Sequence, residues 1–195
     1  MSFQPGILEV KLPAWMEDFL LGRVTCIASI RDRMSLVIEA ARLNVVQGTG
    51  GPFAAAVFET ESGKLVSLGV NLVVAGGMSI LHAEMLAFAL AQKKLGSYDL
   101  GRRDLPAHEL VTSTEPCAMC FGAVPWSGVS RVITGARDSD ARNIGFDEGP
   151  KMSTWRSELE KRGISTLCDV EREAAAQVLL DYSLQGGKIY NSREP

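Results

Sequence analysis

Residues 109–126 read ELVTSTEPCAMCFGAVPW and join a β-branched run to a run of small and apolar residues through a proline. Residues 109–114 are typical of a buried strand, and residues 117–126 are typical of a helix that Pro116 opens. A strand followed directly by a helix is the repeating unit of α/β folds, in which helices cover a sheet. This stretch therefore predicts an α/β protein.

The same alternation continues on both sides of this stretch. Further strands are expected at 53–59, 65–75, 129–135 and 164–169, with a hairpin loop at 60–64. Further helices are expected at 13–47, 79–95, 152–162 and 172–184. Gly22 can divide the first helical run, and Ser79 is the expected N-cap of the second. The crossovers predict a largely parallel sheet with helices on both faces, to which the hairpin adds an antiparallel pair.

Length and composition limit the class of protein. The 195 residues fit a single domain, in which residues 1–50 are expected to be a helical extension packed on residues 51–195. With 46% hydrophobic and 22% charged residues, the chain is neither disordered nor fibrous, and its net charge of −3 disfavours nucleic acid as a partner. No apolar run is long enough to span a membrane, and residues 1–12 lack a signal-peptide layout, so a cytoplasmic location is expected.

The four cysteines do not form the pattern of a disulfide framework, which suits shorter secreted chains. Cys117 and Cys120 form a C-x-x-C pair, which is a metal site, a redox motif or an accident. A redox pair usually follows the first strand of its fold, whereas this pair lies past the middle of the chain, so a metal site is favoured. Cys26 and Cys168 are expected to be buried thiols, and His108 is expected at the surface.

A second group of polar residues, His82-Ala83-Glu84, begins the helix before the one that carries Cys117. Both helices follow strands, so their N-termini can meet at one edge of the sheet. One imidazole and two thiolates suit tetrahedral zinc with an open fourth position for water, and Glu84 could move that water's proton. The alternatives are a core histidine with two buried thiols, or a zinc module that only stabilises the fold. The presence of Glu84 argues against the zinc module.

The H-x-E and P-C-x-x-C signature resembles that of the cytidine deaminase-like superfamily over residues 52–147. The resemblance implies a three-layer α/β/α sandwich with a central mixed five-stranded sheet. It implies one catalytic Zn²⁺ per chain, with His82, Cys117 and Cys120 as ligands. It also implies that Glu84 is the catalytic proton shuttle.

Within this superfamily, the chain looks most like the bacterial guanine deaminases. The residues that carry this likeness are Gly51-Pro52-Phe53, Asn71, Trp126 and Gly145-Phe146-Asp147-Glu148, where Glu148 replaces the aspartate of that group. The resemblance implies hydrolysis of guanine to xanthine and ammonia, or the same reaction on a related aminopurine or aminotriazine. The substrate-binding residues it suggests are Phe53, Asn71, Ala83, Trp126, Asp147, Glu148 and Tyr190. Because guanine presents two adjacent donors, N1–H and the 2-amino group, one carboxylate such as Glu148 can accept both and also take part in proton transfer.

A tRNA adenosine deaminase is the main alternative, because it shares the H-A-E and P-C-x-M-C core and resembles residues 131–138. The acidic balance and the lack of a basic C-terminal helix argue against it. Deaminases of cytosine, pterins or riboflavin precursors are further alternatives. Enzymes of the resembled group are usually homodimers, so we expect a homodimer. The resembled guanine deaminases also exchange C-terminal segments, and the resemblance makes Tyr190 the candidate aromatic that closes the partner's site, with a disordered C-terminus as the alternative.

Overall fold

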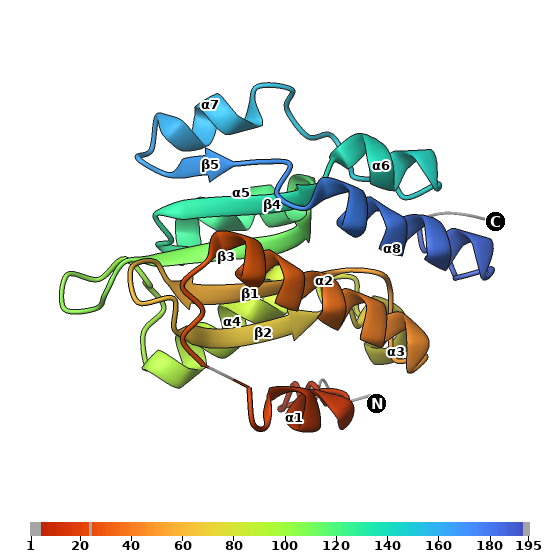
Figure 1. The fold of residues 1–195 in the computed structure, drawn as a ribbon, viewed down its shortest axis with the longest axis horizontal. Coiled ribbons are helices and arrows are strands. Elements are labelled where there is room, and N and C mark those ends of the chain that lie inside the picture. The colour runs from red at the N-terminus through yellow and green to blue at the C-terminus, as the bar shows by residue number, and fades with distance from the viewer. Residues whose placement is uncertain (1–4, 24, 193–195) are drawn as a thin grey trace.

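The computed structural model of the protein describes residues 5–23 and 25–192. A central sheet lies between two helical layers, with α2 and α8 in front of it in Figure 1 and α4 and α5 behind it. The strands are β1 (Ala54–Glu59), β2 (Leu65–Val70), β3 (His108–Thr114), β4 (Arg131–Ala136) and β5 (Ser165–Leu167). The helices are α1 (Trp15–Leu20), α2 (Ile30–Val46), α3 (Val73–Gly76), α4 (Ala83–Leu95), α5 (Ala118–Ser127), α6 (Asp138–Asn143), α7 (Trp155–Glu160) and α8 (Arg172–Leu184).

The five strands have the order β2-β1-β3-β4-β5. β1 is antiparallel to both of its neighbours, β2 and β3, whereas β4 is parallel to β3 and β5. The predicted mixed five-stranded sandwich is therefore confirmed. Because β2 and β3 run in the same direction, their carboxyl ends lie at the same edge of the sheet. The connections to α4 and α5 leave from that edge.

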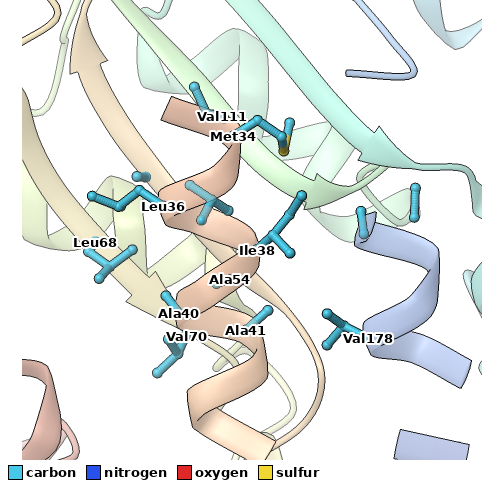
Figure 2. Close-up of a cluster of buried hydrophobic side chains, with 14 of the residues drawn as sticks. Met34, Leu36, Ile38, Ala40, Ala41, Ala54, Leu68, Val70, Val111 and Val178 are labelled. Atoms are coloured by element: carbon cyan, nitrogen blue, oxygen red, sulfur yellow. The ribbon is translucent and has the colours of Figure 1, made fainter. Parts of the chain in front are cut away.

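Both faces of the sheet are buried, which explains why β1 is apolar from Ala54 to Phe58. Side chains alternate between the layers, so Ala54, Ala56 and Phe58 pack in the cluster under α2 and α8, while Ala55 and Val57 pack under α4 and α5. Figure 2 shows α2 crossing the first face, with its apolar side chains directed at the strands and at α8. These alanines let the helices approach the sheet closely.

Several local predictions differ from the structure. The helical run at 13–47 is divided into α1 and α2, and Gly22 in the break has a φ of +74°. Cys26 in this break is exposed rather than buried, because it forms an isolated bridge with Lys64 at the edge of the sheet. The expected strand at 65–75 ends at Val70, and α3 and α6 were not expected. The expected boundary between the helical extension and the rest of the chain, at residue 50, falls between α2 and β1. However, α2 is one of the helices that cover the sheet.

A buried ionic cluster lies at the edge of the sheet opposite the carboxyl ends of β2 and β3. Glu109, which is fully buried at the start of β3, accepts from Arg33 Nη1 at 2.6 Å and from Arg131 Nε at 2.7 Å. The Arg33 side chain is only 2% exposed and also donates to three backbone carbonyls, those of residues 27, 28 and 60. His108 beside it is fully buried, so its predicted surface position is wrong, because pairing with β1 and β4 covers both sides of β3.

In the part of the chain that the structure describes, the helices are too short or too polar to cross a membrane.

Candidate active site

The two sequence motifs meet at the helix starts, as their order along the chain predicted. His82 is the N-cap residue of α4, in place of the expected Ser79, and Cys117 is the N-cap residue of α5. The ring Nδ1 of His82 lies 3.4 Å from Cys117 Sγ and 3.6 Å from Cys120 Sγ. The two helices therefore hold one imidazole and two thiols as a compact trio.

This trio has the dimensions of a zinc site. Zinc binds nitrogen at about 2.0 Å and sulfur at about 2.3 Å, so tetrahedral geometry places an N ligand and an S ligand about 3.5 Å apart. The observed separations of 3.4 and 3.6 Å agree with that value. Hydrogen bonding with Cys120 and His82 lowers the pKa of Cys117 to about 4, which favours the thiolate that binds metal. The donor set therefore fits zinc.

Glu84 lies in the first turn of α4, next to the trio. Its carboxylate is nearly buried, accepts from Cys120 Sγ at 3.4 Å and lies 3.4 Å from the hydroxyl of Thr112 on β3. Burial, and then the negative charge of Cys117, raise the pKa of Glu84 above its ordinary value. A raised pKa makes a carboxyl group a better proton acceptor, as a group that takes up and returns a proton during catalysis requires.

A cavity of about 240 Å³ opens beside the trio. Of the predicted site residues, those that line it are Phe53, Asn71, His82, Glu84, Cys117, Asp147, Glu148 and Tyr190. Cys120 lies just behind this wall as a fully buried thiol, and Ala83 is buried between His82 and Glu84. The structure does not bring Trp126 to the cavity, because that side chain is 83% exposed at the last turn of α5.

Aromatic side chains form one wall of the cavity. Phe146 makes edge-to-face contacts with Phe53 and Tyr190, with ring centroids 5.0 and 5.2 Å apart. Phe146 was not among the predicted site residues, although it directly precedes Asp147 and Glu148. Tyr190 reaches the wall from the C-terminal segment of the same chain, where Asn191 accepts from the backbone N–H of Asp147 at 2.9 Å. The last residues of the predicted capping tail, 193–195, lie outside the described residues.

Glu148 is held by its backbone against the metal-binding helix. Its carbonyl accepts from the N–H of Ala118 at 2.9 Å, and Lys151 in the same loop donates to the carbonyl of Pro116 at 3.0 Å. The Lys151 ammonium is also ion-paired with Asp138 at 2.8 Å. Burial, together with the negative charges of Cys117 and Glu84, raises the pKa of Glu148 to about 8. The carboxyl group can therefore exchange a proton near neutral pH.

Asn71 lies at the end of β2 and is 1% exposed. Its side-chain oxygen accepts from the N–H of Val73 at 3.3 Å, and its side chain is hydrogen-bonded to Tyr190. Its backbone is fixed by Asn44 of α2, which donates to the Asn71 carbonyl at 2.9 Å. Sequence reasoning missed Asn44, because a polar residue on a helix gives no sign of a partner 27 positions away.

Comparison with known proteins agrees with this geometry. Residues 28–136 match the family described as the cytidine and deoxycytidylate deaminase zinc-binding region. The structure is similar to that of guanine deaminase from Nitrosomonas europaea, with 45% identity, a TM-score of 0.88 and coverage of 94% of this chain and all of that one. A structure of a related protein in complex with 2,6-diaminopurine has 48% identity, covers 95% of this chain and 97% of its own, and has a TM-score of 0.87.

Among proteins of established function, guanine deaminase from Bacillus subtilis is 38% identical over 101 residues, or 52% of this chain. That match spans 60% of the Bacillus protein. The tRNA-specific adenosine deaminase of the same organism is 39% identical over 77 residues, which are 40% of this chain and 45% of that protein. The chain is therefore a homologue of guanine deaminases along nearly its whole length, whereas this adenosine deaminase matches a shorter segment.

Proposed function

The chain belongs to the family of zinc-dependent cytidine and deoxycytidylate deaminases, and from this premise we propose that it hydrolyses guanine to xanthine and ammonia. The observation that carries the proposal is the position of Glu148. This carboxyl group lines the same small cavity as Glu84 and two members of the metal trio, His82 and Cys117, so one base can reach all of them. Closely related aminopurines and aminotriazines with the same donor face are included in the proposal.

Glu84 performs the proton transfers in the proposed reaction. His82, Cys117 and Cys120 would hold one zinc ion, which, when bound, supplies Lewis-acid activation of the attacking water. Glu84 accepts a proton from that water as oxygen bonds to C2, and delivers it to a ring nitrogen. Glu84 then moves the second proton of that water, from the new hydroxyl on C2 to the amino group, so that the C2–N bond breaks, a C2 carbonyl forms and ammonia leaves. The raised pKa of Glu84 suits this alternation of base and acid.

The cavity walls account for the choice of base. In its ionised form, the Glu148 carboxylate can accept from N1–H and from the 2-amino group of guanine, a pair of adjacent donors that neutral adenine and cytosine lack. The Asn71 amide can both donate and accept at the ring edge. Phe53 and Tyr190 flank the base, and Asp147 lies at the rim with 67% of its side chain exposed. The backbone N–H of Ala83 is a further proposed contact for the substrate.

The size and charge of the site favour a free base over tRNA. The cavity of about 240 Å³ is smaller than the roughly 300–1,000 Å³ of pockets for drug-sized ligands. The net charge of −3 provides little attraction for a phosphate backbone. Both observations favour guanine over an adenosine in an anticodon loop.

The decisive experiment measures ammonia release by the zinc-loaded protein from guanine, adenine, cytosine, ammeline and adenosine-containing tRNA. Glu84→Gln should retain zinc and fold but lose about 10²–10⁴-fold in kcat, the usual contribution of general acid–base catalysis. Glu61→Gln, at an exposed hairpin position, is the matched control and should retain full activity. Guanine turnover by Glu84→Gln at the wild-type rate would exclude the proposed shuttle, and turnover of tRNA alone would exclude the proposed substrate.

We also propose a cytoplasmic homodimer that pairs through α5. This helix is apolar on its outer face, with Met119 37% and Trp126 83% exposed. Large exposed apolar side chains on one helix are typical of a contact surface. Tyr190 lines the cavity from the C-terminal segment, and exchange of that segment between the two chains of the proposed dimer would place it over the partner's cavity.

A further inference from the structure

Asn44 on α2 joins two segments that line the cavity, although its own side chain does not line it. This residue is fully buried, and its Nδ2 amide donates to the carbonyl of Gly51 and to the carbonyl of Asn71, both at 2.9 Å. Both amide hydrogens are thereby used. Gly51 is two residues before Phe53, and Asn71 is itself a wall residue. One side chain therefore fixes the start of β1 to the end of β2 at the cavity.

The packing around this amide leaves little freedom. A Cβ atom at Gly50 would lie 1.9 Å from the carbonyl oxygen of Asn71 and 2.7 Å from Nδ2 of Asn44. Such distances are far inside van der Waals contact, so only glycine fits, and the backbone at residue 50 approaches Asn71 directly. Because close-packed surroundings transmit small displacements, a change at Asn44 will move the Asn71 backbone.

The Asn44 amide is held in turn by a hydrogen-bond relay that leads outward to the N-terminal helix. Its Oδ1 accepts from the Thr49 hydroxyl at 2.8 Å, and Trp15 Nε1 of α1 donates to that same hydroxyl oxygen at 3.0 Å. The acceptor bond fixes which end of the amide carries the hydrogens, so Nδ2 faces the two carbonyls. The relay therefore connects α1, which lies outside the sheet-covering layers, to a residue of the site.

We propose that Asn44 is a positioning residue that sets the Asn71 amide for binding of the base, with Thr49 and Trp15 holding it in orientation. The inference rests on the proposed function and assigns a role to part of the N-terminal extension. Asn44 acts on binding and not on proton transfer, because its bonded carbonyls lie in the two segments that carry Phe53 and Asn71, whereas Glu84 is held by α4 and contacts β3. Loss of Asn44 therefore weakens binding of the base and leaves the chemical step unchanged.

The test measures KM and kcat for guanine together with the Kd of 8-azaguanine by calorimetry. Asn44→Ala should raise KM and Kd about tenfold or more, leave kcat within about threefold and retain the wild-type zinc content. When Asn44→Ala is added to Asn71→Ala, the Kd should change by less than about twofold, because the Asn71 amide through which Asn44 acts is already absent. Thr49→Val, which keeps the side-chain shape, should raise Kd about two- to fivefold and covers the case in which Asn44→Ala does not fold.

Ser67→Ala is the matched control, because the buried Ser67 hydroxyl also donates to a backbone carbonyl, that of Ala87 at 2.7 Å, away from the cavity. It should leave Kd unchanged. The inference is overturned if Ser67→Ala raises Kd as much as Asn44→Ala. It is also overturned if Asn44→Ala has its full effect without Asn71, or if kcat falls in place of affinity. Wild-type protein that neither binds 8-azaguanine nor releases ammonia from guanine would refute the proposed function itself.

Discussion

Substitution of Glu109 by glutamine should destabilise the fold strongly while leaving the active site intact. The amide keeps the shape of the carboxylate but removes its charge and replaces one of the two acceptor oxygens with a donor group. In the variant, the Arg33 side chain stays buried without a counter-charge, because it is only 2% exposed and is held by three backbone carbonyls. The Arg131 side chain is 27% exposed and can be hydrated instead. Breaking a buried ion pair costs about 3–5 kcal/mol, and with one stranded arginine we expect the lower end, about 3 kcal/mol.

The assay is equilibrium unfolding in urea at pH 7 with saturating zinc, together with thermal melting. For a chain of this size, about 3 kcal/mol corresponds to a fall in Tm of roughly 6–12 °C. Glu39→Gln is the control, because Glu39 makes a two-bond pair with Arg23 at 2.8 and 3.0 Å but is about half exposed, and such pairs contribute about 0–1 kcal/mol. The reasoning is refuted if the two variants differ by less than about 1 kcal/mol in free energy of unfolding.

Three further results are expected. Asn71→Ala should raise KM for guanine about 10- to 100-fold in steady-state assays and should affect kcat less. The reason is that the polar edge of the bound base would lose its partner, and an unpaired buried polar group costs about 1–3 kcal/mol. Trp126→Glu should shift the protein from dimer to monomer in sedimentation without loss of bound zinc; an unchanged dimer would exclude α5 as the interface. Hydrogen bonds from Arg172 at 2.8 and 3.0 Å lower the pKa of Asp140. The stability that the ionised Asp140 carboxylate contributes is therefore present above its ordinary pKa of 3.8 and is lost as the pH falls through the lowered pKa. Asp140→Asn should therefore be less stable than wild type at pH 7, by about 1 kcal/mol in urea unfolding, and the difference should shrink as the pH falls below 4.

The juxtaposition of His82 and Glu84 with Cys117 and Cys120 could be predicted from the sequence because each motif is local. His82 and Glu84 share one helical turn, Cys117 and Cys120 share another, and strand order places both turns at one edge. The order of most strands and helices could also be predicted, because strands that are buried on both faces appear in the sequence as long apolar runs.

The parts that escaped prediction depend on contacts between distant segments. His108 and Glu109 lie in a polar stretch, so their burial becomes evident only when β1 and β4 pair with β3. Asn44 has no local feature that distinguishes it from a solvated helix residue. Trp126 follows the metal motif closely, but it is at the far end of a ten-residue helix whose start forms the site.

The cavity draws its walls from residues as far apart as Phe53 and Tyr190, whereas the metal trio lies within residues 82–120. Metal capture and substrate enclosure are thus separable properties of one polypeptide. A proteolytic cut between α8 and Tyr190 would leave a species that still binds zinc but whose cavity is open to solvent. Metal content alone would count such clipped molecules as intact, so it is a poor measure of how many molecules in a preparation are competent.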